Sequence, residues 1–551
     1  MTSTLTVNGA WPTEFGLRSS RIFTMDHAHR VVDGWLHVRD GRILGVTEGE
    51  PPQSVGATVF DLGDKPVLPG FVDPHVHLEM SAAALWGTVD CHTPPCGSIG
   101  ELVAQLHDHR HLREQRGGWL IGQGGLFADR RFTDGRLPTR DDLDKVSTRF
   151  PIAVRFGAHV TVLNSVALDL AREHGLPTTG DAHIHTDGTG RWTGILHELY
   201  YALPIPAMTP DELRRATAAT AHSQLTRHGV TTIGEITNTV QGMELLADAA
   251  GGEVPQQVRA FVWSPGTMSV RATCDRQHAG GFPRTGSFEV AGVKIFVDGG
   301  FSAAGAAVLK PYRSDPSSRG RMAYSRSELV DLVRDTDEAG LQVAAHANGE
   351  RAQWELCRAS VLARAGATGP RPGLRLEHGG NVLTHPETAE RWAEAGAVIV
   401  PQAGFIWTMG SFLPEYLGDY AADNLFPFRS LLDQGMSVAS SSDGAGSELL
   451  QFNPMFGVQC AVGRMSCTGQ PVAPAEAVSV TEALAMHTRF AAEALGVADT
   501  RGSLEPGKRA DLVVLERDPT QVDTGELAGL LPEQVLFAGV PSDPAGPKEP
   551  S

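Results

Sequence analysis

The sequence predicts an α/β protein: a (β/α)8 barrel with a small β-sandwich formed from both chain ends and a large insertion after the first barrel strand. Three observations predict it, namely eight apolar segments of strand length, helix-start and helix-stop patterns between them, and alternating segments near both termini. The expected β-sandwich comprises residues 1–66 and 495–551, and the barrel comprises residues 67–494. An open, doubly wound sheet is the alternative, but no GxGxxG-type turn follows any of these segments.

Short strands separated by turns are typical of both chain ends. Within residues 18–62, in LHVRDGRILGVTEG, apolar residues alternate on either side of Asp40-Gly41, a dipeptide favoured in two-residue β-hairpins. Near residues 502–518, GSLEPGKRADLVVLERDP has the pattern of a turn followed by an apolar strand. Two strand-rich ends around a large middle part predict one sheet domain made from both.

Eight candidate strands lie in the middle part. They are residues 67–72, 230–236, 257–263, 290–297, 341–346, 374–378, 397–402 and 437–443. Eight parallel strands, each followed by a helix, form a (β/α)8 barrel. Because the first candidate ends at residue 72 and the second begins at residue 230, we expect an insertion at roughly residues 90–205.

Helix-start patterns precede three of these strands. Thr209-Pro210-Asp211-Glu212 combines an N-cap Thr, a Pro at the first helical position and a Glu that closes a capping box. Ser325 with Glu328 and Thr384 with Glu387 repeat the pattern. Each predicted helix has a glycine stop before the following strand: Gly229, Gly340 and Gly396.

Composition excludes several classes of function. Of the 551 residues, 41% are hydrophobic and 20% charged, as in a soluble globular enzyme. A net charge of −18 argues against nucleic acid or an anionic membrane as a partner. No stretch approaches the roughly 18–20 apolar residues of a membrane span, and the first residues lack the features of a secretory signal. With six scattered cysteines that suit no disulfide scaffold, we expect a cytoplasmic protein.

Ionisable side chains recur at the carboxyl ends of the candidate strands, where barrel enzymes place their active sites. His75 and His77 alternate in FVDPHVHLEM, so in extended backbone both imidazoles point to the same side. Four further residues follow from other strands: Lys294, His346, His378 and Asp443. Each alone has an ordinary structural explanation, but all six at one end of one barrel indicate a functional site.

The segments around these six residues, and several others, resemble motifs of a known group of proteins. LPGFVDPHVHLEM, VKIFVDGG, AAHANGERA, RLEHGG, SSSDG and GSLEPGKRADLVVL resemble the amidohydrolase superfamily. In particular they resemble amidohydrolase family 3, which contains N-substituted formamide deformylases and YtcJ-like metal-dependent hydrolases. RLPTRDDLD, HVTVLNSVAL and TGILHE of the insertion look similar to the same family. The resemblance extends from about residue 20 to residue 520.

The resemblance implies a metal site held by the six residues His75, His77, Lys294, His346, His378 and Asp443. It implies that Lys294 is carboxylated and bridges a binuclear centre, with one or two divalent ions per chain, zinc being the expected metal. His159, in GAHVTVLNS, matches a family position that faces the substrate. The only partners expected are a small-molecule substrate and, as in many proteins of this kind, a second copy in a homodimer.

The implied activity is hydrolysis of a C–N amide bond in a small molecule of the N-substituted formamide or N-acyl amine type. Metal-activated hydroxide attacks the carbonyl carbon, and Asp443 acts as general base, with Lys294 as the other catalytic residue. Alternatives on the same site are a cyclic amide hydrolase, a deaminase, an ester or carbamate hydrolase, and, outside catalysis, an inactive binding barrel. The sequence departs from the family pattern at Gly300, Glu350 and Gly444, which bears on substrate preference.

Weaker candidates lie elsewhere. The second HxH pair, His183 and His185, is expected in a surface hairpin, and Cys91 and Cys96 lack the second pair that a zinc knuckle requires. Phe405 and Trp407, after the seventh candidate strand, are equally compatible with substrate contact and with core packing.

Overall fold

The computed structural model of the chain describes residues 11–49, 58–157, 160–176, 184–197, 199, 203–301, 304–313, 315–366, 371–444 and 448–542. The chain forms two compact units. The main unit comprises Met1–Val76, Ala221–Asp443 and Leu450–Ser551, and the insertion unit comprises His77–Thr220 and Gly444–Leu449. None of the helices in the described ranges has both the length and the apolar character needed to cross a membrane.

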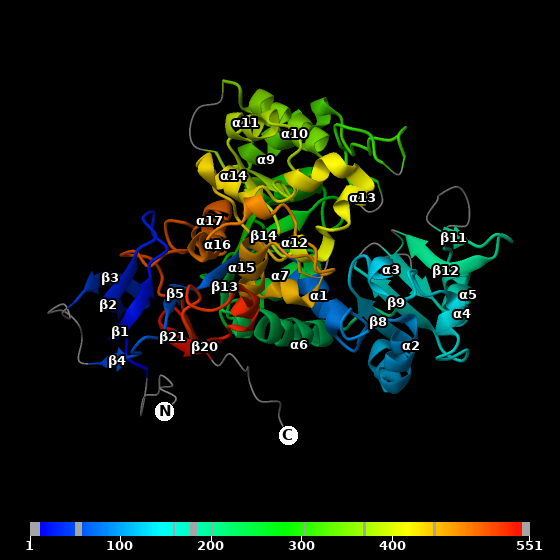
Figure 1. Ribbon diagram of the computed structural model, residues 1–551, viewed down its shortest axis with the longest axis horizontal. Helices are drawn as coiled ribbons and strands as arrows, with labels where there is room; N and C mark the ends of the chain where they lie inside the picture. The colour runs from blue at the N-terminus through cyan, green and yellow to red at the C-terminus, as the bar shows by residue number, and fades with distance from the viewer. Residues whose placement is uncertain are drawn as a thin grey trace. The chain divides into compact units, whose positions relative to one another are not determined.

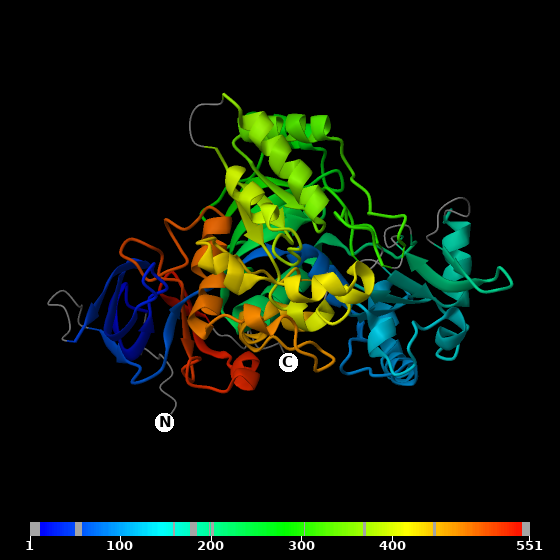
Figure 2. The same ribbon diagram turned by 45° about the horizontal axis from the view of Figure 1, so that its top comes forward.

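Strands from both chain ends form one eight-stranded sheet, the composite sheet, in the main unit. Its strands are β1 (Glu14–Phe23), β2 (Val31–Arg39), β3 (Arg42–Glu48), β4 (Val59–Asp61), β5 (Val67–Pro69), β19 (Leu512–Leu515), β20 (Pro532–Phe537) and β21 (Val540–Ser542). Figures 1 and 2 show the blue first strands and the red last segments of the chain together. The predicted hairpin at Asp40-Gly41 is confirmed: β2 and β3 pair antiparallel, and both turn residues have positive φ, 48° and 73°.

The second sheet of the main unit is parallel and has seven strands. They are β6 (Phe71–Val76), β13 (Val230–Thr237), β14 (Gln257–Trp263), β15 (Phe288–Phe296), β16 (Gln342–His346), β17 (Leu374–Glu377) and β18 (Ala397–Val400). They pair in chain order, each with the next. The prediction of parallel strands alternating with helices is therefore confirmed, and six of the seven strands lie close to their expected positions.

The first barrel strand is misplaced in the prediction of 67–72. The chain divides at Gly70 into β5, which belongs to the composite sheet, and β6, which begins the parallel sheet. A Cβ atom at residue 70 would lie 2.3 Å from Thr231 Oγ1, so no side chain fits at this crossing. An apolar run alone does not reveal that the chain changes sheets within it.

The eighth predicted strand, 437–443, is not a regular strand. Val438 forms an isolated parallel bridge with Ile399 of β18. Ser441 N donates to Pro401 O at 3.1 Å, and Asp443 N donates to His75 O at 3.0 Å. Residues 437–443 are thus hydrogen-bonded to the chain next to β18 on one side and to the end of β6 on the other.

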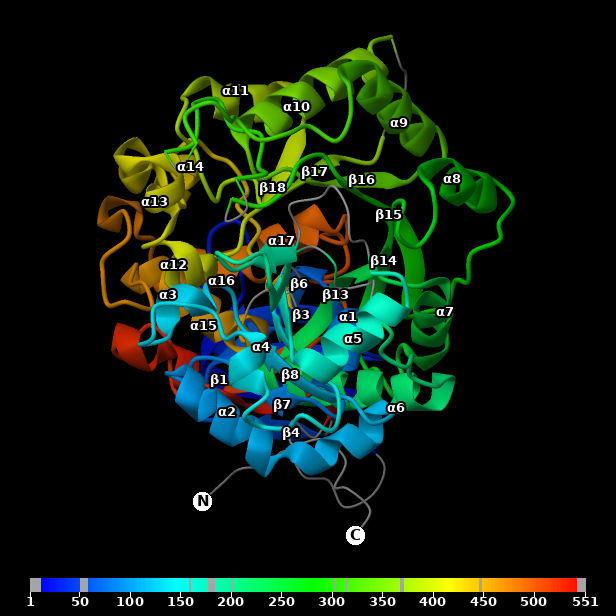
Figure 3. The same ribbon diagram turned by 90° about the vertical axis from the view of Figure 1, so that its right-hand side faces the viewer.

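Helices follow most strands of the parallel sheet. Those of the main unit are α7 (Val240–Ala249), α8 (Val270–His278), α9 (Arg326–Glu338), α10 (Glu350–Arg364), α11 (Glu387–Glu394), α12 (Phe405–Met409), α13 (Leu413–Leu417), α14 (Phe428–Asp433), α15 (Pro454–Gly463), α16 (Val480–Met486) and α17 (Arg489–Ala494). Figure 3 shows α7 to α11 outside strands β14 to β18. The predicted capping box of Ser325 and Glu328 is confirmed at the start of α9.

The predicted cap at Thr384 is wrong, because α11 begins only after Pro386. Thr384 N donates to Glu350 Oε1 at 3.1 Å instead, and the Thr384 hydroxyl donates to the same carboxylate. Glu350, which stands where the family pattern has a shorter acid, therefore holds the chain ahead of α11. A distant carboxylate competes here with the local capping box that the sequence suggests.

The insertion unit has its own sheet and its own core. Its strands are β7 (Val89–Asp90), β8 (Leu120–Gly124), β9 (Ile152–Phe156), β10 (Val160–Leu163), β11 (Ile184–Thr186) and β12 (Trp192–His197). Its helices are α1 (Leu78–Leu85), α2 (Ile99–Asp108), α3 (Ala128–Arg131), α4 (Arg140–Leu143), α5 (Ser165–Glu173) and α6 (Pro210–Thr220). The capping box predicted at Thr209 is present: Thr209 N donates to Glu212 Oε2 at 2.8 Å, and Glu212 N donates to Thr209 Oγ1 at 3.3 Å.

Candidate metal centre

Three side chains with metal-ligand chemistry come together at the end of β6. His75, His77 and Asp443 each offer one ligand atom, and these atoms all lie within 4.8 Å of one another. His75 Nε2 lies 3.5 Å from Asp443 Oδ1. The unit boundary falls between Val76 and His77, and His77 continues directly from β6. Two imidazoles and one carboxylate form a donor set that suits zinc and other divalent transition metals.

Lys294 reaches the same group of side chains from β15, which is separated from β6 by β14 and β13 in the parallel sheet. Its side chain is fully buried, and its Nζ lies 3.4 Å from His75 Nε2. Burial lowers the pKa of Lys294 to about 8, opposed by the charges of Glu377 and Asp443 and reinforced by that of Arg375. At neutral pH roughly a tenth of such amines are uncharged, far more than at an ordinary lysine pKa. A neutral amine can react with carbon dioxide, whereas an ammonium cannot.

A carboxylate behind His75 orients its ring. His75 Nδ1 lies 2.6 Å from Glu377 Oε2, and Arg375 Nε donates to the other oxygen of Glu377 at 2.8 Å. Burial opposes ionisation of Glu377, but the charge of Arg375 and the hydrogen bond with His75 outweigh it and hold the pKa of Glu377 below its usual value. Since a carboxylate only accepts, Nδ1 carries the hydrogen and Nε2 presents its lone pair toward Asp443 and Lys294.

His75 itself is uncharged at neutral pH. Burial lowers the pKa of His75 to about 3, and the positive charge of Lys294 lowers it further, against Glu377 and Asp443. A metal ligand must be the neutral imidazole, so this environment suits ligation.

His378 is oriented by an amide instead of a carboxylate. Its Nδ1 lies 2.8 Å from Gln402 Oε1, while Gln402 Nε2 donates to Val400 O and Ser441 Oγ, each at 2.9 Å. Because those two acceptors fix the amide orientation, His378 Nδ1 is the donor and its Nε2 carries the lone pair. The His378 ring centroid lies 5.6 Å from that of His75.

His346, at the end of β16, lies beside His378, with ring centroids 4.6 Å apart. Its Nε2 lies 3.0 Å from Asn348 Nδ2 and 3.4 Å from Gly299 O. Burial lowers the pKa of His346, and the charges of His378 and Lys294 add to this. The structure thus brings His346 and His378 next to the group of His75, His77, Lys294 and Asp443.

Asp298 holds the loop after β16, which carries Asn348 beside His346. The buried carboxylate of Asp298 accepts backbone N–H groups of Ala307 at 2.8 Å, Asn348 at 2.9 Å and Gly349 at 2.8 Å. Burial raises the pKa of Asp298 to about 7, although these three donors lower it. Through these hydrogen bonds Asp298 joins the loop after β15 to the loop after β16.

Asp73 holds the backbone segment that carries Asp443. Its Oδ1 accepts Ser442 N at 3.0 Å and His75 N at 3.3 Å, which joins the 440–443 segment to β6. Burial raises the pKa of Asp73 to about 7 despite these donors. Asp443 and His378 both have positive φ, 50° and 70°. Such backbone costs of order 1–3 kcal/mol per residue and persists only where the surroundings enforce it.

Sequence reasoning missed these supporting residues: Asp73, Asp298, Arg375, Glu377 and Gln402. One pattern could have revealed two of them, because Arg375 and Glu377 alternate with Leu374 and Leu376 in a strand expected to be buried. Two opposite charges on one side of a buried strand require partners. The others follow no local pattern.

The other residues singled out from the sequence lie in different parts of the chain. His159, the predicted substrate-facing residue, lies outside the described residues, as does His183. His185 is exposed in the antiparallel hairpin of β11 and β12, as expected. Cys91 and Cys96 are buried. Phe405 is buried, and its ring lies nearly parallel to that of His378, with centroids 6.4 Å apart.

Known proteins resemble this chain over most of its length. It is 32% identical over 524 residues to the N-substituted formamide deformylase of Arthrobacter pascens, covering 91% of this chain and 93% of that protein. It is 26% identical over 521 residues to the amidohydrolase YtcJ of Bacillus subtilis strain 168, covering 89% and 92%. An uncharacterized metal-dependent hydrolase from Pyrococcus furiosus has a similar fold, with a TM-score of 0.70 and 24% identity over 92% of this chain and 100% of that chain.

The family assignment rests on sequence as well as fold. The sequence pattern of the amidohydrolase family matches residues 58–542, which include all six candidate ligands and every strand of the parallel sheet. The resemblance seen in the motifs is thereby confirmed, and the chain belongs to the amidohydrolase family.

Proposed function

We propose that this protein is a metal-dependent hydrolase that cleaves the C–N bond of a small amide, of the N-substituted formamide or N-acyl amine type. The observation that carries the proposal is Lys294: a fully buried lysine whose Nζ lies 3.4 Å from the neutral His75, within a group that also holds His77 and Asp443. Burying a lysine beside a histidine costs free energy unless its amine has a partner or a function. As part of this proposal, the 437–443 segment closes the parallel sheet into an eight-stranded barrel.

The residues present fit a divalent metal. His75, His77 and Asp443 would hold one ion, and His346 and His378 would hold a second, with carboxylated Lys294 shared between them. In carboxylation the neutral Nζ bonds to the carbon of carbon dioxide as one C=O π pair moves onto oxygen, and one N–H proton is then lost to solvent, which leaves an anionic carbamate. Bound metal would supply Lewis acidity toward the amide oxygen and toward water.

Asp443 is the residue that we assign to proton transfer. Its side chain is 15% exposed, against 1% for His75, so solvent and substrate can reach it, as they can reach the partly buried His77. Its carboxylate takes a proton from the attacking water and delivers it to the departing amine nitrogen. Asp73 and the backbone bond to His75 keep it in position.

The substrate class rests on the relative that is 32% identical, whose name states that it deformylates N-substituted formamides. Phe405, buried beside His378, is the apolar side chain that we assign to the wall next to the substituent of such a substrate. The departure at Gly300 follows Gly299, whose carbonyl oxygen lies 3.4 Å from His346 Nε2, so it can change which N-substituent is accepted.

Metal content tests the proposal first. We expect one or two equivalents of a divalent metal per chain by mass spectrometry of protein purified without chelators, and formate release from N-substituted formamides. Lys294→Ala should lose both metal and turnover, because alanine has no amine from which a carbamate could form. Bicarbonate with a short-chain carboxylic acid should partly restore both. Wild-type metal content and turnover in Lys294→Ala would contradict the role of Lys294.

Replacement of the proposed base is the second test. Asp443→Asn should lower turnover by about 10²–10⁴-fold, since an amide cannot accept the proton. Asp331→Asn, at an exposed position on α9, is the matched control and should leave turnover unchanged. Circular dichroism establishes that both variants fold. Near-normal turnover of Asp443→Asn would refute its role in proton transfer.

A further inference from the structure

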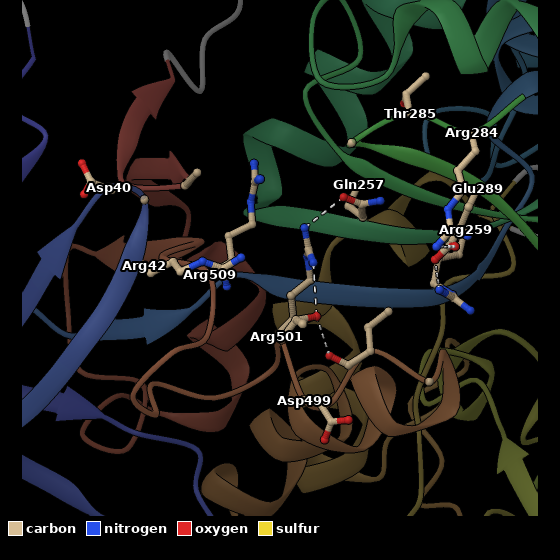
Figure 4. A pocket seen from close by; sticks show the side chains of 16 residues that line it. Asp40, Arg42, Gln257, Arg259, Arg284, Thr285, Glu289, Asp499, Arg501 and Arg509 are labelled. Carbon is tan, nitrogen blue, oxygen red and sulfur yellow. Dashed lines mark hydrogen bonds and ion pairs between the residues drawn. The ribbon is translucent and has the colours of Figure 1, made fainter. Parts of the chain in front are cut away.

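Five arginines line a cavity of about 480 Å³ in the main unit, which we term the arginine pocket: Arg42, Arg259, Arg284, Arg501 and Arg509. They come from four parts of the fold (Figure 4): the β2–β3 hairpin, the start of β14, the turn before β15 and the chain after α17. The pocket lies at the amino ends of β14 and β15, whereas Lys294 lies toward the carboxyl end of β15. It is therefore separate from the candidate metal centre.

Two carboxylates serve as ion-pair partners for four of these arginines. Glu289 pairs with Arg259 and, at 3.3 Å, with Arg284. Asp511 lies 3.3 Å from Arg501 and 2.8 Å from Arg509. Two more acidic residues line the pocket, but Figure 4 shows the carboxylates of Asp40 and Asp499 directed away from Gln257 and Arg501 at its centre. Five arginines therefore line one cavity of a chain whose net charge is −18.

The guanidinium groups repel one another. Burial lowers the pKa of Arg501, Asp511 opposes this, and the charges of Arg509, Arg259 and Arg42 lower it again. Burial likewise lowers the pKa of Arg259, and Arg375 and Arg284 add to the effect against Glu289. Like charges held this close destabilise one another, and an anion placed among them reduces that repulsion.

The side chains that reach the solvent are positioned for a ligand. Arg42 and Arg284 are exposed, and Arg42 uses one nitrogen to donate to Gly507 O at 2.9 Å. Arg501 is anchored by donating to Gln257 Oε1 at 3.0 Å. Arginine presents several N–H donors in a planar fork that matches the oxygen pairs of phosphates and carboxylates. The cavity volume lies within the range of small-molecule sites.

We propose that the arginine pocket binds a small oxyanion with two or more negative charges, of the phosphate or dicarboxylate type. The ligand contacts residues of the composite sheet and of the parallel sheet together, so it stabilises the folded main unit by mass action. This inference is independent of the proposed hydrolase activity.

Titration calorimetry of the full-length protein tests the proposal, with inorganic phosphate and succinate as separate probes at constant ionic strength. We expect saturable binding of at least one probe and a higher melting temperature in its presence. Binding of phosphate alone identifies a phosphoryl ligand, and binding of succinate alone identifies a dicarboxylate. No saturable binding of either probe would overturn the proposal.

Variants locate the binding. Arg42→Gln combined with Arg284→Gln should weaken binding at least tenfold and abolish the melting-temperature rise, and both positions are exposed, so the fold should persist. Arg271→Gln is the matched control, because Arg271 is an arginine of α8 outside the pocket with an 84% exposed side chain. Equal affinity in the double variant would place the anion elsewhere, including at the candidate metal centre, and would overturn the assignment.

Discussion

Buried histidines in this protein differ in the hydrogen-bond partners of their ring nitrogens. His75 has Glu377 at 2.6 Å and His378 has Gln402 at 2.8 Å, and in both cases the contact leaves Nε2 as an acceptor. His487 is equally buried, but within the described residues its Nε2 has no hydrogen-bond partner. Burial alone lowers the pKa of His487 to about 3. The rings of His75 and His378 therefore present an Nε2 lone pair that can bind a metal, while His487 is a structural residue packed against Gly457.

We predict that His487 makes folding stability depend on pH. Above pH 6.5 the ring is neutral in both the folded and the unfolded chain and has no effect. As pH falls from 6.5 toward 3, only the unfolded chain takes up the proton, so stability is lost by at most about 1.4 kcal/mol per pH unit.

Comparison of His487→Asn with the natural chain isolates this contribution. Melting temperatures measured from pH 7 to pH 4.5 should fall less steeply in the variant, whatever its stability at pH 7. His185→Asn, at an exposed histidine of β11, should retain the natural slope. Parallel curves for His487→Asn and the natural chain would show that His487 titrates normally when folded.

At the scale of elements, the loops after the strands are held by carboxylates and by close backbone contact. Asp298 joins the loops after β15 and β16 through three backbone N–H groups. Gly349, the N-cap of α10, belongs to the same contact: a Cβ there would lie 2.1 Å from Ala307 O. The position of His346 relative to the other candidate ligands therefore depends on a residue without a side chain.

Gly349→Ala should destabilise this region by about 1–3 kcal/mol, as overpacking typically does, and should lower metal content. Gly373→Ala is the matched control, because its nearest atom, Gln342 Nε2, would be 3.8 Å from the added Cβ. The free energy of unfolding, measured by fluorescence, and the metal content are to be compared between the two variants. Equal stability and metal content in the two variants would show that the loop relaxes around the added methyl group.

At the scale of the whole molecule, separate apolar clusters support the separate parts of the chain. The composite sheet is built on one cluster, including Leu17, Leu36 and Leu512. The insertion unit has two clusters of its own, one around Leu102 and Leu120 and one around Ala153 and Leu168. Because these clusters lie within one part each, we expect the parts to fold largely on their own contacts.

Replacing residues 90–205 by a short flexible linker tests this independence. Helices α1 and α6 remain and pack against each other, with the Arg215 guanidinium 5.7 Å from the Trp86 ring centroid, so the linker joins neighbouring ends. We expect natural metal content and altered substrate preference. The same deletion with His75→Ala should lose metal. A folded deletion variant without metal would mean that the insertion supplies a ligand.

The sequence by itself determined the elements whose cause is local. Alternation around Asp40-Gly41 determined a hairpin, and the capping boxes at Thr209 and Ser325 determined helix starts. The six candidate ligands could be recognised because strand ends in parallel α/β units place their side chains on one edge. Their residue types and order then sufficed to indicate the family.

Only the tertiary structure decided the features that depend on distant partners. It placed Glu377 behind His75, 302 residues away in sequence, and gave Thr384 a carboxylate of α10 in place of a local cap. It divided one apolar run at Gly70 between two sheets, and it gathered five arginines from separate segments into one pocket. Periodicity and capping depend on neighbours in sequence, whereas hydrogen-bond partners, like-charge contacts and steric room depend on which segments the fold brings together.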